Sequence, residues 1–382
     1  MTNVDQVLSL EDLEPLAQRL LPNCIFSFVS GGAETNAALN GNRAAFDSFE
    51  LVPEVLVNTS KRSAEITLFS DRWSAPFGIA PMGGAGLAGY RADCALALAA
   101  HEEKVPFILS GSSLVPLEEI ARINPDAWFQ AYLSVDRDEI GALLDRVYAS
   151  GFRTLVITAD VPVSGNRENL IRAGFSTPLR PTVKLALDAV RHPRWLFSTA
   201  TRTVLRHGMP RYENATANGG APVFSATATR AHLRDALSWE DLEWIRGKWN
   251  ARLIVKGILS RADAAKAHEV GADAIIASNH GGRQLDCAIS PLHALPQIVE
   301  AARDMPVLYD SGARRGTDVL KAMAQGAKMV FIGRPFLYAA ALGEDKAISR
   351  AINLLRSEID RNMALLGCND LHDISRRVRR RV

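Results

Sequence analysis

The amino-acid sequence predicts an α/β fold: a (β/α)8 TIM barrel with N-terminal helices and a long insertion after the fourth strand. Apolar runs alternate with helical patterns eight times along the chain, and polar residues gather where these runs end. Runs such as Leu155–Asp160 and Leu253–Gly257 are nearly continuous in apolar residues, as expected for parallel strands covered on both faces. No glycine fingerprint of a dinucleotide-binding sheet follows an early run, so a doubly wound sheet is the less favoured alternative.

The predicted strands are short and are separated by helical stretches such as Ala92–Glu103 and Thr317–Gln325. In chain order, the strands are Ala75–Met82, Pro106–Ser110, Trp128–Leu133, Thr154–Asp160, Arg252–Lys256, Ala274–Ser278, Pro306–Asp310 and Met329–Gly333. Before the first strand, Ser9 and Asp12 form a capping-box pattern that precedes apolar residues at helical spacing. We therefore expect N-terminal helices that close one end of the barrel.

A long insertion lies between the fourth and fifth predicted strands. Its middle, from Arg180 to Arg211, holds seven Lys or Arg residues and a single acid, Asp188, interleaved with apolar and aromatic residues. One interpretation is a segment that lies on an anionic membrane surface. The other interpretation is an ordinary insertion between two barrel strands, with a basic face exposed to solvent, or a disordered lid. We expect one domain, 1–382, in which the insertion 176–237 is mobile or membrane-facing.

Composition excludes several classes of protein. The net charge is +2, so no global feature indicates a nucleic-acid partner. The four cysteines are far apart and lack metal-ligand spacing, which predicts free thiols in a reducing compartment and no metal site. The chain has no run of about 18 apolar residues, so we expect no membrane span. Its N-terminus lacks a basic segment followed by an apolar one, so we expect no signal peptide. We expect a cytoplasmic protein, with peripheral contact to the inner face of the membrane if the insertion docks there.

The segment Ser278–Asp286, with sequence SNHGGRQLD, follows an apolar run and carries the strongest chemical signal. His280 can take a proton near neutral pH, and the Arg283 guanidinium can hold a carboxylate in two-point geometry. The alternative is a polar turn with solvated charges. Other polar residues also end the predicted strands, on the face where barrel enzymes build their sites. So many on one rim favour a large polar ligand.

The segments after the last two strands, Asp310–Gly316 and Ile332–Arg334, combine glycines with arginines. Phosphate sites in barrels commonly form there, which predicts a ligand that carries a phosphate. Lys256 ends the fifth strand and can place a positive charge beside an anionic ring system. A Schiff-base role for Lys256 is less favoured, because a histidine and carboxylate are already available for the chemistry.

From about Leu10 to Ser375, these motifs resemble the family of FMN-dependent L-2-hydroxy acid oxidases and dehydrogenases. SNHGGRQLD is highly specific to that family. The longer form SNHGGRQLDCAISP, with residues 192–195 and 206–210 of the insertion, resembles its mandelate-oxidising members most. The resemblance implies FMN as the cofactor, a 2-hydroxy acid as the substrate, and a homo-oligomer, since members are often tetramers.

The resemblance also implies a role for each matching residue. His280 matches the catalytic base and Asp160 the carboxylate that orients it. Lys256 matches the lysine that stabilises the reduced flavin. The substrate would be held by Tyr132, Arg167 and Arg283. The FMN would be contacted by Pro81, Met82, Gly83, Ser110, Gln130, Thr158, Lys256 and Ser278, and its phosphate by Asp310, Ser311, Gly312, Ala313, Arg314, Gly333 and Arg334.

The chain departs from the family at Phe28, where a tyrosine usually contacts the substrate carboxylate. The missing hydrogen bond should weaken binding by roughly 0.5–1.5 kcal/mol. Either the substrate is larger, or depends less on its carboxylate, or is an ester or amide, or Phe28 simply packs and the arginines suffice. Met82 replaces a common threonine, Gly83 resembles the dehydrogenase members, and Ser112 leaves room for a bulky substrate.

We therefore expect oxidation of an (S)-2-hydroxy acid, mandelate-like and aryl, to the 2-oxo acid, with a quinone-type electron acceptor. The alternative within enzymes is an oxidase that uses oxygen and releases hydrogen peroxide, including one that acts on a substrate without a free carboxylate. From a different class comes a non-catalytic flavin- or phosphate-binding barrel, which no hydroxy acid would reduce.

Overall fold

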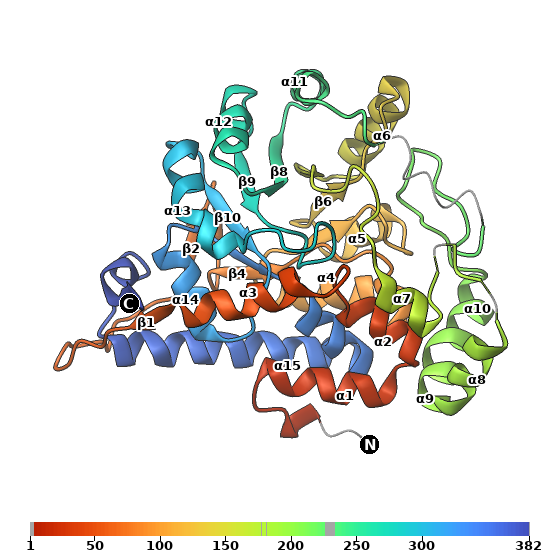
Figure 1. Ribbon diagram of the computed structural model, residues 1–382, viewed down its shortest axis with the longest axis horizontal. Helices are drawn as coiled ribbons and strands as arrows, with labels where there is room; N and C mark the ends of the chain where they lie inside the picture. The colour runs from red at the N-terminus through yellow and green to blue at the C-terminus, as the bar shows by residue number, and fades with distance from the viewer. Residues whose placement is uncertain (1–3, 177, 181, 226–233, 382) are drawn as a thin grey trace.

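The structure is a computed structural model that describes residues 4–176, 178–180, 182–225 and 234–381 (Figure 1). For residues 184 and 344 it describes the backbone alone. Eight parallel strands pair in the order β4-β11-β10-β9-β8-β7-β6-β5. A parallel bridge between Ile79 and Phe107 joins the two ends of this sheet. The predicted (β/α)8 barrel is therefore confirmed.

Each barrel strand begins within the range predicted for it. The strands are β4 (Phe77–Ile79), β5 (Ile108–Ser110), β6 (Trp128–Ala131), β7 (Thr154–Thr158), β8 (Arg252–Ile258), β9 (Ala274–Ala277), β10 (Val307–Asp310) and β11 (Val330–Ile332). The helices that follow them are α4 (Ala92–Glu102), α5 (Leu117–Ile123), α6 (Arg137–Ala149), α11 (Trp239–Lys248), α12 (Arg261–Glu269), α13 (Pro291–Ala302), α14 (Gly316–Ala324) and α15 (Arg334–Leu366).

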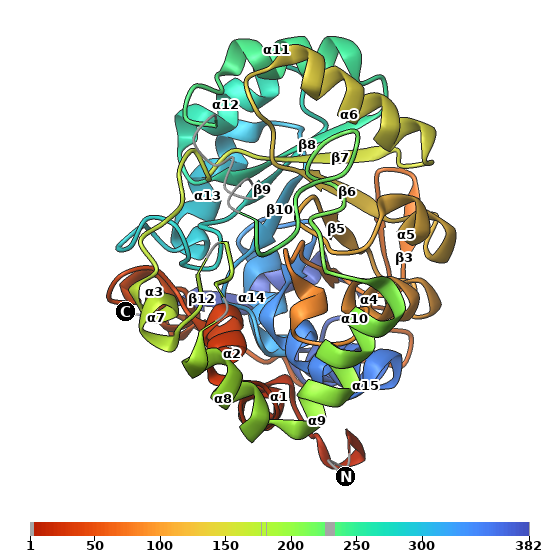
Figure 2. The same ribbon diagram turned by 90° about the vertical axis from the view of Figure 1, so that its right-hand side faces the viewer.

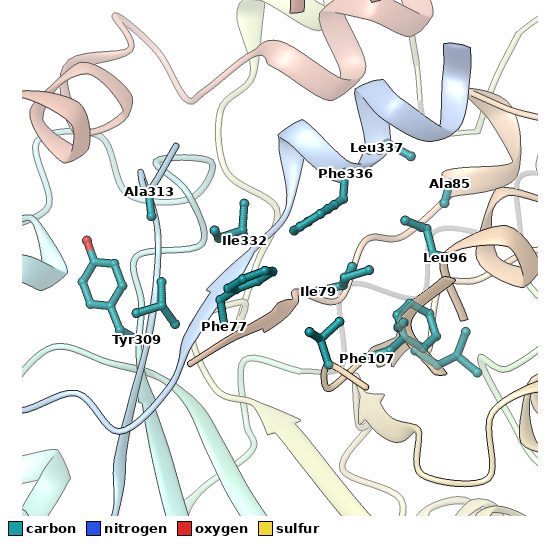
Figure 3. Close-up of a cluster of buried hydrophobic side chains, with 14 of the residues drawn as sticks. Phe77, Ile79, Ala85, Leu96, Phe107, Tyr309, Ala313, Ile332, Phe336 and Leu337 are labelled. Carbon is teal, nitrogen blue, oxygen red and sulfur yellow. The ribbon is translucent and has the colours of Figure 1, made fainter. Parts of the chain in front are cut away.

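The core has two layers, as the alternation of side chains along a strand requires. Inside the barrel, nearly every strand contributes at least one buried apolar residue, including Ile108, Val156, Ile254 and Leu308. The larger layer lies between the strands and the surrounding helices. There the ring of Phe77 on β4 stacks on Phe336 of α15, with centroids 6.3 Å apart (Figure 3). These layers fix which strand residues face inward.

The predicted N-terminal helices precede the barrel strands. They are α1 (Leu13–Leu20), α2 (Asn23–Ser30) and α3 (Ala37–Asp47), and α1 packs along α15 (Figure 1). The floor is closed by an antiparallel hairpin that the sequence did not reveal, β2 (Ile66–Leu68) with β3 (Asp71–Trp73). Leu68 and Trp73 join the core inside the barrel. A second ribbon pairs β1 (Phe49–Leu51) with β12 (Val378–Arg380).

The insertion between β7 and β8 contributes four further helices at one end of the barrel (Figure 2). These are α7 (Glu168–Ala173), α8 (Val183–Arg191), α9 (Pro193–Trp195) and α10 (Arg202–His207), with a π-helical turn at Leu196–Thr201 between the last two. Trp195 anchors them, since its indole nitrogen donates to the Leu87 carbonyl at 2.8 Å. Residues 177, 181 and 226–233 of the insertion lie outside the described residues.

Candidate functional site

A cavity of about 1270 Å³ opens at the C-terminal ends of the barrel strands. The alternation of side chains along each strand explains which polar residues line this cavity. Val156 and Ile254 face inward within the barrel, so Thr158 and Lys256, two residues further on, face inward at the rim. The described lining includes most of the predicted site residues: Phe28, Pro81, Met82, Gly83, Tyr132, Thr158, Arg167, Lys256, His280, Arg283, Asp310, Ser311, Gly312, Ala313, Arg314, Gly333 and Arg334.

The four remaining predicted residues lie just behind this lining. The Ser110 hydroxyl donates to Gln130 Oε1 at 3.0 Å, and both side chains are buried. Ser278 lies beneath Lys256, and Asp160 lies behind His280. The structure thus gathers every predicted site residue at one end of the barrel.

His280 and Asp160 form the central pair of the site. The Nδ1 atom of His280 lies 3.0 Å from Asp160 Oδ1, although the two residues are 120 positions apart. With Nδ1 donating its proton to the carboxylate, the other ring nitrogen, Nε2, is left to accept one. That nitrogen lies 3.5 Å from the Tyr132 hydroxyl, in the cavity. His280 therefore has the orientation of a general base held by an orienting carboxylate.

The protonation of this pair also suits a base. Burial would raise the pKa of Asp160, but His280 and Lys256 outweigh it and lower that pKa, so the carboxylate stays ionised. Burial lowers the pKa of His280, and the Asp160 charge opposes this effect. The imidazole is thus neutral at rest. His280 also has a φ of 58°, a conformation that is costly for a residue with a side chain and that recurs at functional sites.

A bulge in β8 makes room for Asp160. The pairing register of β8 with β9 shifts between Lys256 and Ile258, and the intervening Gly257 has a φ of 108°. A Cβ atom at Gly257 would lie 2.5 Å from the Cβ of Asp160. Only glycine fits there, so this position governs the placement of the carboxylate behind His280.

Lys256 is held beneath the cavity by two buried partners. Its ammonium lies 2.8 Å from Ser278 Oγ and 2.8 Å from Asp310 Oδ2. Burial lowers the pKa of Lys256, but Asp310 and Asp160 more than compensate, and the net shift is upward. Lys256 is therefore a fixed positive charge, which disfavours a nucleophilic amine.

Four arginines line the cavity near one another: Arg167, Arg283, Arg314 and Arg334. Burial, with help from Arg167 and Arg334, lowers the pKa of Arg283 well below its usual range. Burial and Arg334 lower the pKa of Arg314 to about 10. Crowded guanidiniums stay protonated in proteins, so these shifts mark a region where positive charge is costly until an anion enters.

Arg283 and Arg334 share two backbone acceptors, the carbonyls of Val29 and Gly31 at the end of α2. Arg167 is held differently, because its Nε donates to the Arg283 carbonyl at 2.9 Å. These bonds fix the guanidiniums while leaving them without a carboxylate partner within ion-pair distance among the described residues. A substrate carboxylate and a phosphate are anions of the kind this cluster can bind.

The residues present fit the flavin that the sequence suggests. Three buried polar atoms that surround the inner end of the cavity have no hydrogen-bond partner within the described protein: Gln130 Nε2, Thr158 Oγ1 and Asp160 Oδ2. Buried polar groups are nearly always satisfied, so a polar ligand is expected to supply the partners. The donor and acceptor groups, the Lys256 cation and the arginines together suit a polar ring with a phosphate at its far end.

Phe28 packs within the site, as one of the two sequence interpretations expected. Its ring stacks on Phe175 with centroids 4.6 Å apart, and the Arg283 guanidinium lies 5.4 Å from its centre. The phenyl ring offers no hydrogen bond, so it shapes the cavity wall without contacting an anion through a hydroxyl.

Gln284 is a site residue to which the sequence assigned no role. Its Oε1 accepts from Arg167 at 2.6 Å and from the Gly165 amide at 3.3 Å. Its Nε2 donates to the carbonyls of Val163 at 2.9 Å and Asp160 at 3.2 Å. A single side chain therefore joins the segment after β9 to the loop that carries Asp160 and Arg167.

Two other residues of the same segment hold it against α3. The amides of Asn279 and Asn42 exchange hydrogen bonds of 2.8 and 2.7 Å. The Asp286 carboxylate accepts from the Thr35 hydroxyl and from the Ala38 amide. Their polar character is visible in the sequence, but their partners lie more than 230 positions away.

We expect Gln284→Leu to weaken binding of a substrate carboxylate by about 1–3 kcal/mol, because Arg167 and the loop amides lose buried partners. Titration of FMN-loaded protein with an unreactive acid such as phenylacetate measures this change. Gln284→Glu keeps the acceptor for Arg167 and should recover part of the loss. Leu285→Ser, at an adjacent side chain that is 73% exposed, is the matched control. Equal affinity in Gln284→Leu and the control would contradict the role.

Arg234 also lines the cavity, and no motif in the sequence indicated it. Its guanidinium lies 4.6 Å from the centre of the Tyr132 ring. The residue belongs to the end of the insertion, just before α11, where only the fold brings it over the barrel rim. Among the described residues, no group of three or more His, Cys, Asp or Glu side chains could hold a metal ion.

Comparison with known proteins agrees with this geometry. The sequence pattern of the FMN-dependent dehydrogenase family matches residues 17–381. The chain is 38% identical to (S)-mandelate dehydrogenase of Pseudomonas putida over 371 residues, which cover 97% of this chain and 93% of that protein. It is 37% identical to L-lactate dehydrogenase of Pectobacterium atrosepticum over 370 residues, covering 95% and 94% of the two chains.

Solved structures are similar over nearly the whole chain. The crystal structure of the monotopic membrane protein (S)-mandelate dehydrogenase has a TM-score of 0.88 at 36% identity, covering 98% of this chain and 100% of that one. Mandelate oxidase with (S)-2-phenylpropionate has a TM-score of 0.82 at 32% identity, covering 99% and 100%. The family pattern, the sequence relatives and the rim geometry agree, and the chain belongs to the FMN-dependent 2-hydroxy acid dehydrogenase family.

Proposed function

We propose that this FMN-dependent enzyme oxidises an (S)-2-hydroxy acid of the mandelate type to the 2-oxo acid, with His280 as the base. The observation that carries the proposal is the His280–Asp160 pair, 3.0 Å apart, which leaves Nε2 facing a cavity lined by Arg167 and Arg283. A proton acceptor beside an anion-binding cluster is what abstraction of a hydroxyl proton from a hydroxy carboxylate requires.

The side chains act in a defined order in this proposal. Arg283 and Arg167 hold the substrate carboxylate and thereby orient the hydroxyl toward His280. The Nε2 atom accepts the hydroxyl proton, and ionised Asp160 stabilises the resulting imidazolium. Tyr132 donates a hydrogen bond near the same oxygen. FMN, when bound, supplies the acceptor for the hydride that leaves C2.

Lys256 and the rim segments would hold the cofactor. The Lys256 ammonium would lie at the edge of the flavin that becomes negative on reduction. Ser110, Gln130, Thr158 and Ser278 would bond to its polar atoms. The phosphate would lie among Arg314, Arg334 and the amides of residues 310–313 and 333.

A bulky, aryl side chain on the substrate is supported by the wall of the cavity near Phe28. Gly83 and Ser112 line the same cavity as Phe28. Both have small side chains, which occupy little of the space that a substrate ring would need. The relatives include mandelate and lactate dehydrogenases, and this wall favours the mandelate type.

Anaerobic reduction of the bound flavin tests the proposal directly. We expect (S)-mandelate and hydroxymandelate to bleach the flavin absorbance faster than lactate or glycolate, and mandelate esters to react slowly. Fastest bleaching by an ester would instead favour a substrate without a free carboxylate. If no hydroxy acid bleaches the protein, the enzyme assignment of this site fails and a non-catalytic flavin-binding barrel becomes the better account.

For the electron acceptor we propose a membrane quinone. Its support is the exposed surface of the insertion, which can bring the enzyme to the membrane. The alternative is molecular oxygen, with release of hydrogen peroxide. Turnover with a soluble quinone under nitrogen, and no peroxide in air, is the expected result; stoichiometric peroxide would overturn the quinone.

The membrane-contacting surface we propose comprises α8 to α10 with the turn between them. Its large apolar side chains are exposed, with Leu187 at 54%, Phe197 at 68% and Leu205 at 80%. Exposed arginines, including Arg191 and Arg206, lie among them. Apolar groups that enter the headgroup region beside cations that attract anionic lipid form a peripheral anchor. No described helix is long and apolar enough to span a bilayer.

We expect a Leu187→Ser/Phe197→Ser/Leu205→Ser variant to lose most of its binding to vesicles of phosphatidylglycerol and phosphatidylcholine. Co-sedimentation measures binding, and added salt should weaken binding of the unaltered protein. The control is Val55→Ser/Leu56→Ser, which removes side chains that are 79% and 103% exposed from a loop elsewhere. Equal loss in both variants would contradict the assigned surface. The expected homotetramer and cytoplasmic location stay predictions.

A further inference from the structure

The substrate end of the cavity contains a cation for which the proposed reaction has no use. Arg167 and Arg283 suffice for one carboxylate, yet Arg234 lines the same cavity. Its guanidinium lies 4.6 Å from the centre of the Tyr132 ring, within the range of a cation–π contact. Arg234 is therefore held in place by an aromatic ring.

Arg234 stands apart from the other arginines. Arg167 and Arg334 contribute to the lowered pKa of Arg283, whereas burial lowers the pKa of Arg234 and Tyr132 is the group that opposes it. The charges of Arg167 and Arg283 thus act together, at one side of the site. No other described arginine contributes to the shift in the pKa of Arg234, whose guanidinium instead lies against the Tyr132 ring.

No acid neutralises this cation within the described part of the chain. Arg234 forms no ion pair there, although Asp138 and Glu139 of α6 line the same cavity. Arg137, by comparison, also stacks on an aromatic ring, at 5.4 Å from Trp244, but it pairs with Asp241 at 3.1 Å. A partly buried cation without an anion costs free energy, and an anionic ligand group removes that cost.

Both sets of cations border one cavity. Its volume of about 1270 Å³ is shared by the flavin and the substrate, and Arg167, Arg283 and Arg234 all line it. The His280 ring and the Arg234 guanidinium both lie near the Tyr132 ring, at 6.5 and 4.6 Å from its centre. The proposed base and the Arg234 cation are therefore neighbours of the same side chain.

We propose that Arg234 forms a second anion subsite, so that this enzyme prefers 2-hydroxy acids whose side chain carries a second carboxylate. The inference rests on the proposed oxidation of 2-hydroxy acids and adds the class of side chain. The first carboxylate binds to Arg167 and Arg283, the hydroxyl faces His280, and the second carboxylate pairs with Arg234. Tyr132 holds the Arg234 guanidinium over its ring.

The test compares mandelate with 4-carboxymandelate in anaerobic flavin reduction. In the unaltered enzyme, kcat/KM should be higher for the dicarboxylate. In Arg234→Leu, the ratio of the two kcat/KM values should fall about 10- to 100-fold, the range for losing a charge-assisted hydrogen bond. Arg234→Lys should retain much of the preference. Arg137→Leu, an aromatic-stacked arginine outside the cavity lining, should leave the ratio unchanged.

A second measurement separates this inference from the proposed oxidation. Calorimetric binding of 4-carboxyphenylacetate against phenylacetate needs no reaction, since both ligands lack the hydroxyl. A binding preference that is lost in Arg234→Leu supports the subsite even if no hydroxy acid reduces the flavin. An unchanged ratio in Arg234→Leu overturns it. Equal weakening of both ligands also overturns it. Arg234 would then bind the carboxylate that both ligands share, and so replace the tyrosine hydroxyl that Phe28 lacks.

Discussion

His280→Ala is expected to keep its FMN and to reduce it with a hydroxy acid about 10²–10⁴-fold more slowly than the unaltered enzyme, the usual contribution of a general base. The side chain is bonded through Nδ1 to Asp160 at 3.0 Å and is not among the arginines that would hold the phosphate. Flavin absorbance measures cofactor content, and stopped-flow bleaching measures reduction. Undiminished bleaching by this variant would overturn the assignment of the base.

The pH dependence of reduction gives an independent check on the same pair. The base acts in its neutral form, so the rate should fall as pH falls through the pKa of His280, which burial holds below its usual value. Asp160→Asn removes the charge that raises this pKa. The acid limb of the profile should then move to lower pH, and the plateau should drop because the imidazolium loses its stabilising anion. A base other than His280 would leave the limb in place.

Lys256→Met is expected to lower the free energy of unfolding by about 3–5 kcal/mol, because it leaves a buried carboxylate without its cation. The Lys256 ammonium lies 2.8 Å from Asp310 Oδ2, and the two residues are 3% and 9% exposed. Thermal unfolding of the cofactor-free protein measures this effect. The bound flavin should also become harder to reduce, since a positive charge beside its ring is lost.

A double variant separates charge from packing at this position. Lys256→Met/Asp310→Asn removes both charges, so it should recover much of the stability that Lys256→Met loses. The flavin should remain hard to reduce in both variants. If the double variant unfolds at the same temperature as the single one, the ion pair is not the source of the loss.

The insertion was the segment that the sequence left most open. Its basic and apolar composition suited a membrane surface or a solvated excursion equally, because composition does not say which side chains are exposed. The fold shows which side chains are buried and which are exposed. Trp195 is buried and bonded to the Leu87 carbonyl, whereas Phe197, two residues on, is 68% exposed. That distinction depends on contacts with the barrel and with α2.

The sequence by itself determined the barrel and the chemistry of its rim. Buried parallel strands require continuous apolar runs, and a side-chain period of two places Thr158 beyond Val156 and Lys256 beyond Ile254 on the inner face. The segment Ser278–Asp286 likewise indicated a base and an anion clamp from residue types alone. These features are local, so a single chain segment contains them.

Only the tertiary structure decided which of these groups act on one another. It pairs His280 with Asp160 and gives Gln284 its four partners. It also brings Arg234 over Tyr132, from a stretch with no recognisable motif. The physical reason is that such contacts join residues about 100 or more positions apart, whose approach is set by barrel closure and loop packing, and no local periodicity or propensity encodes that approach.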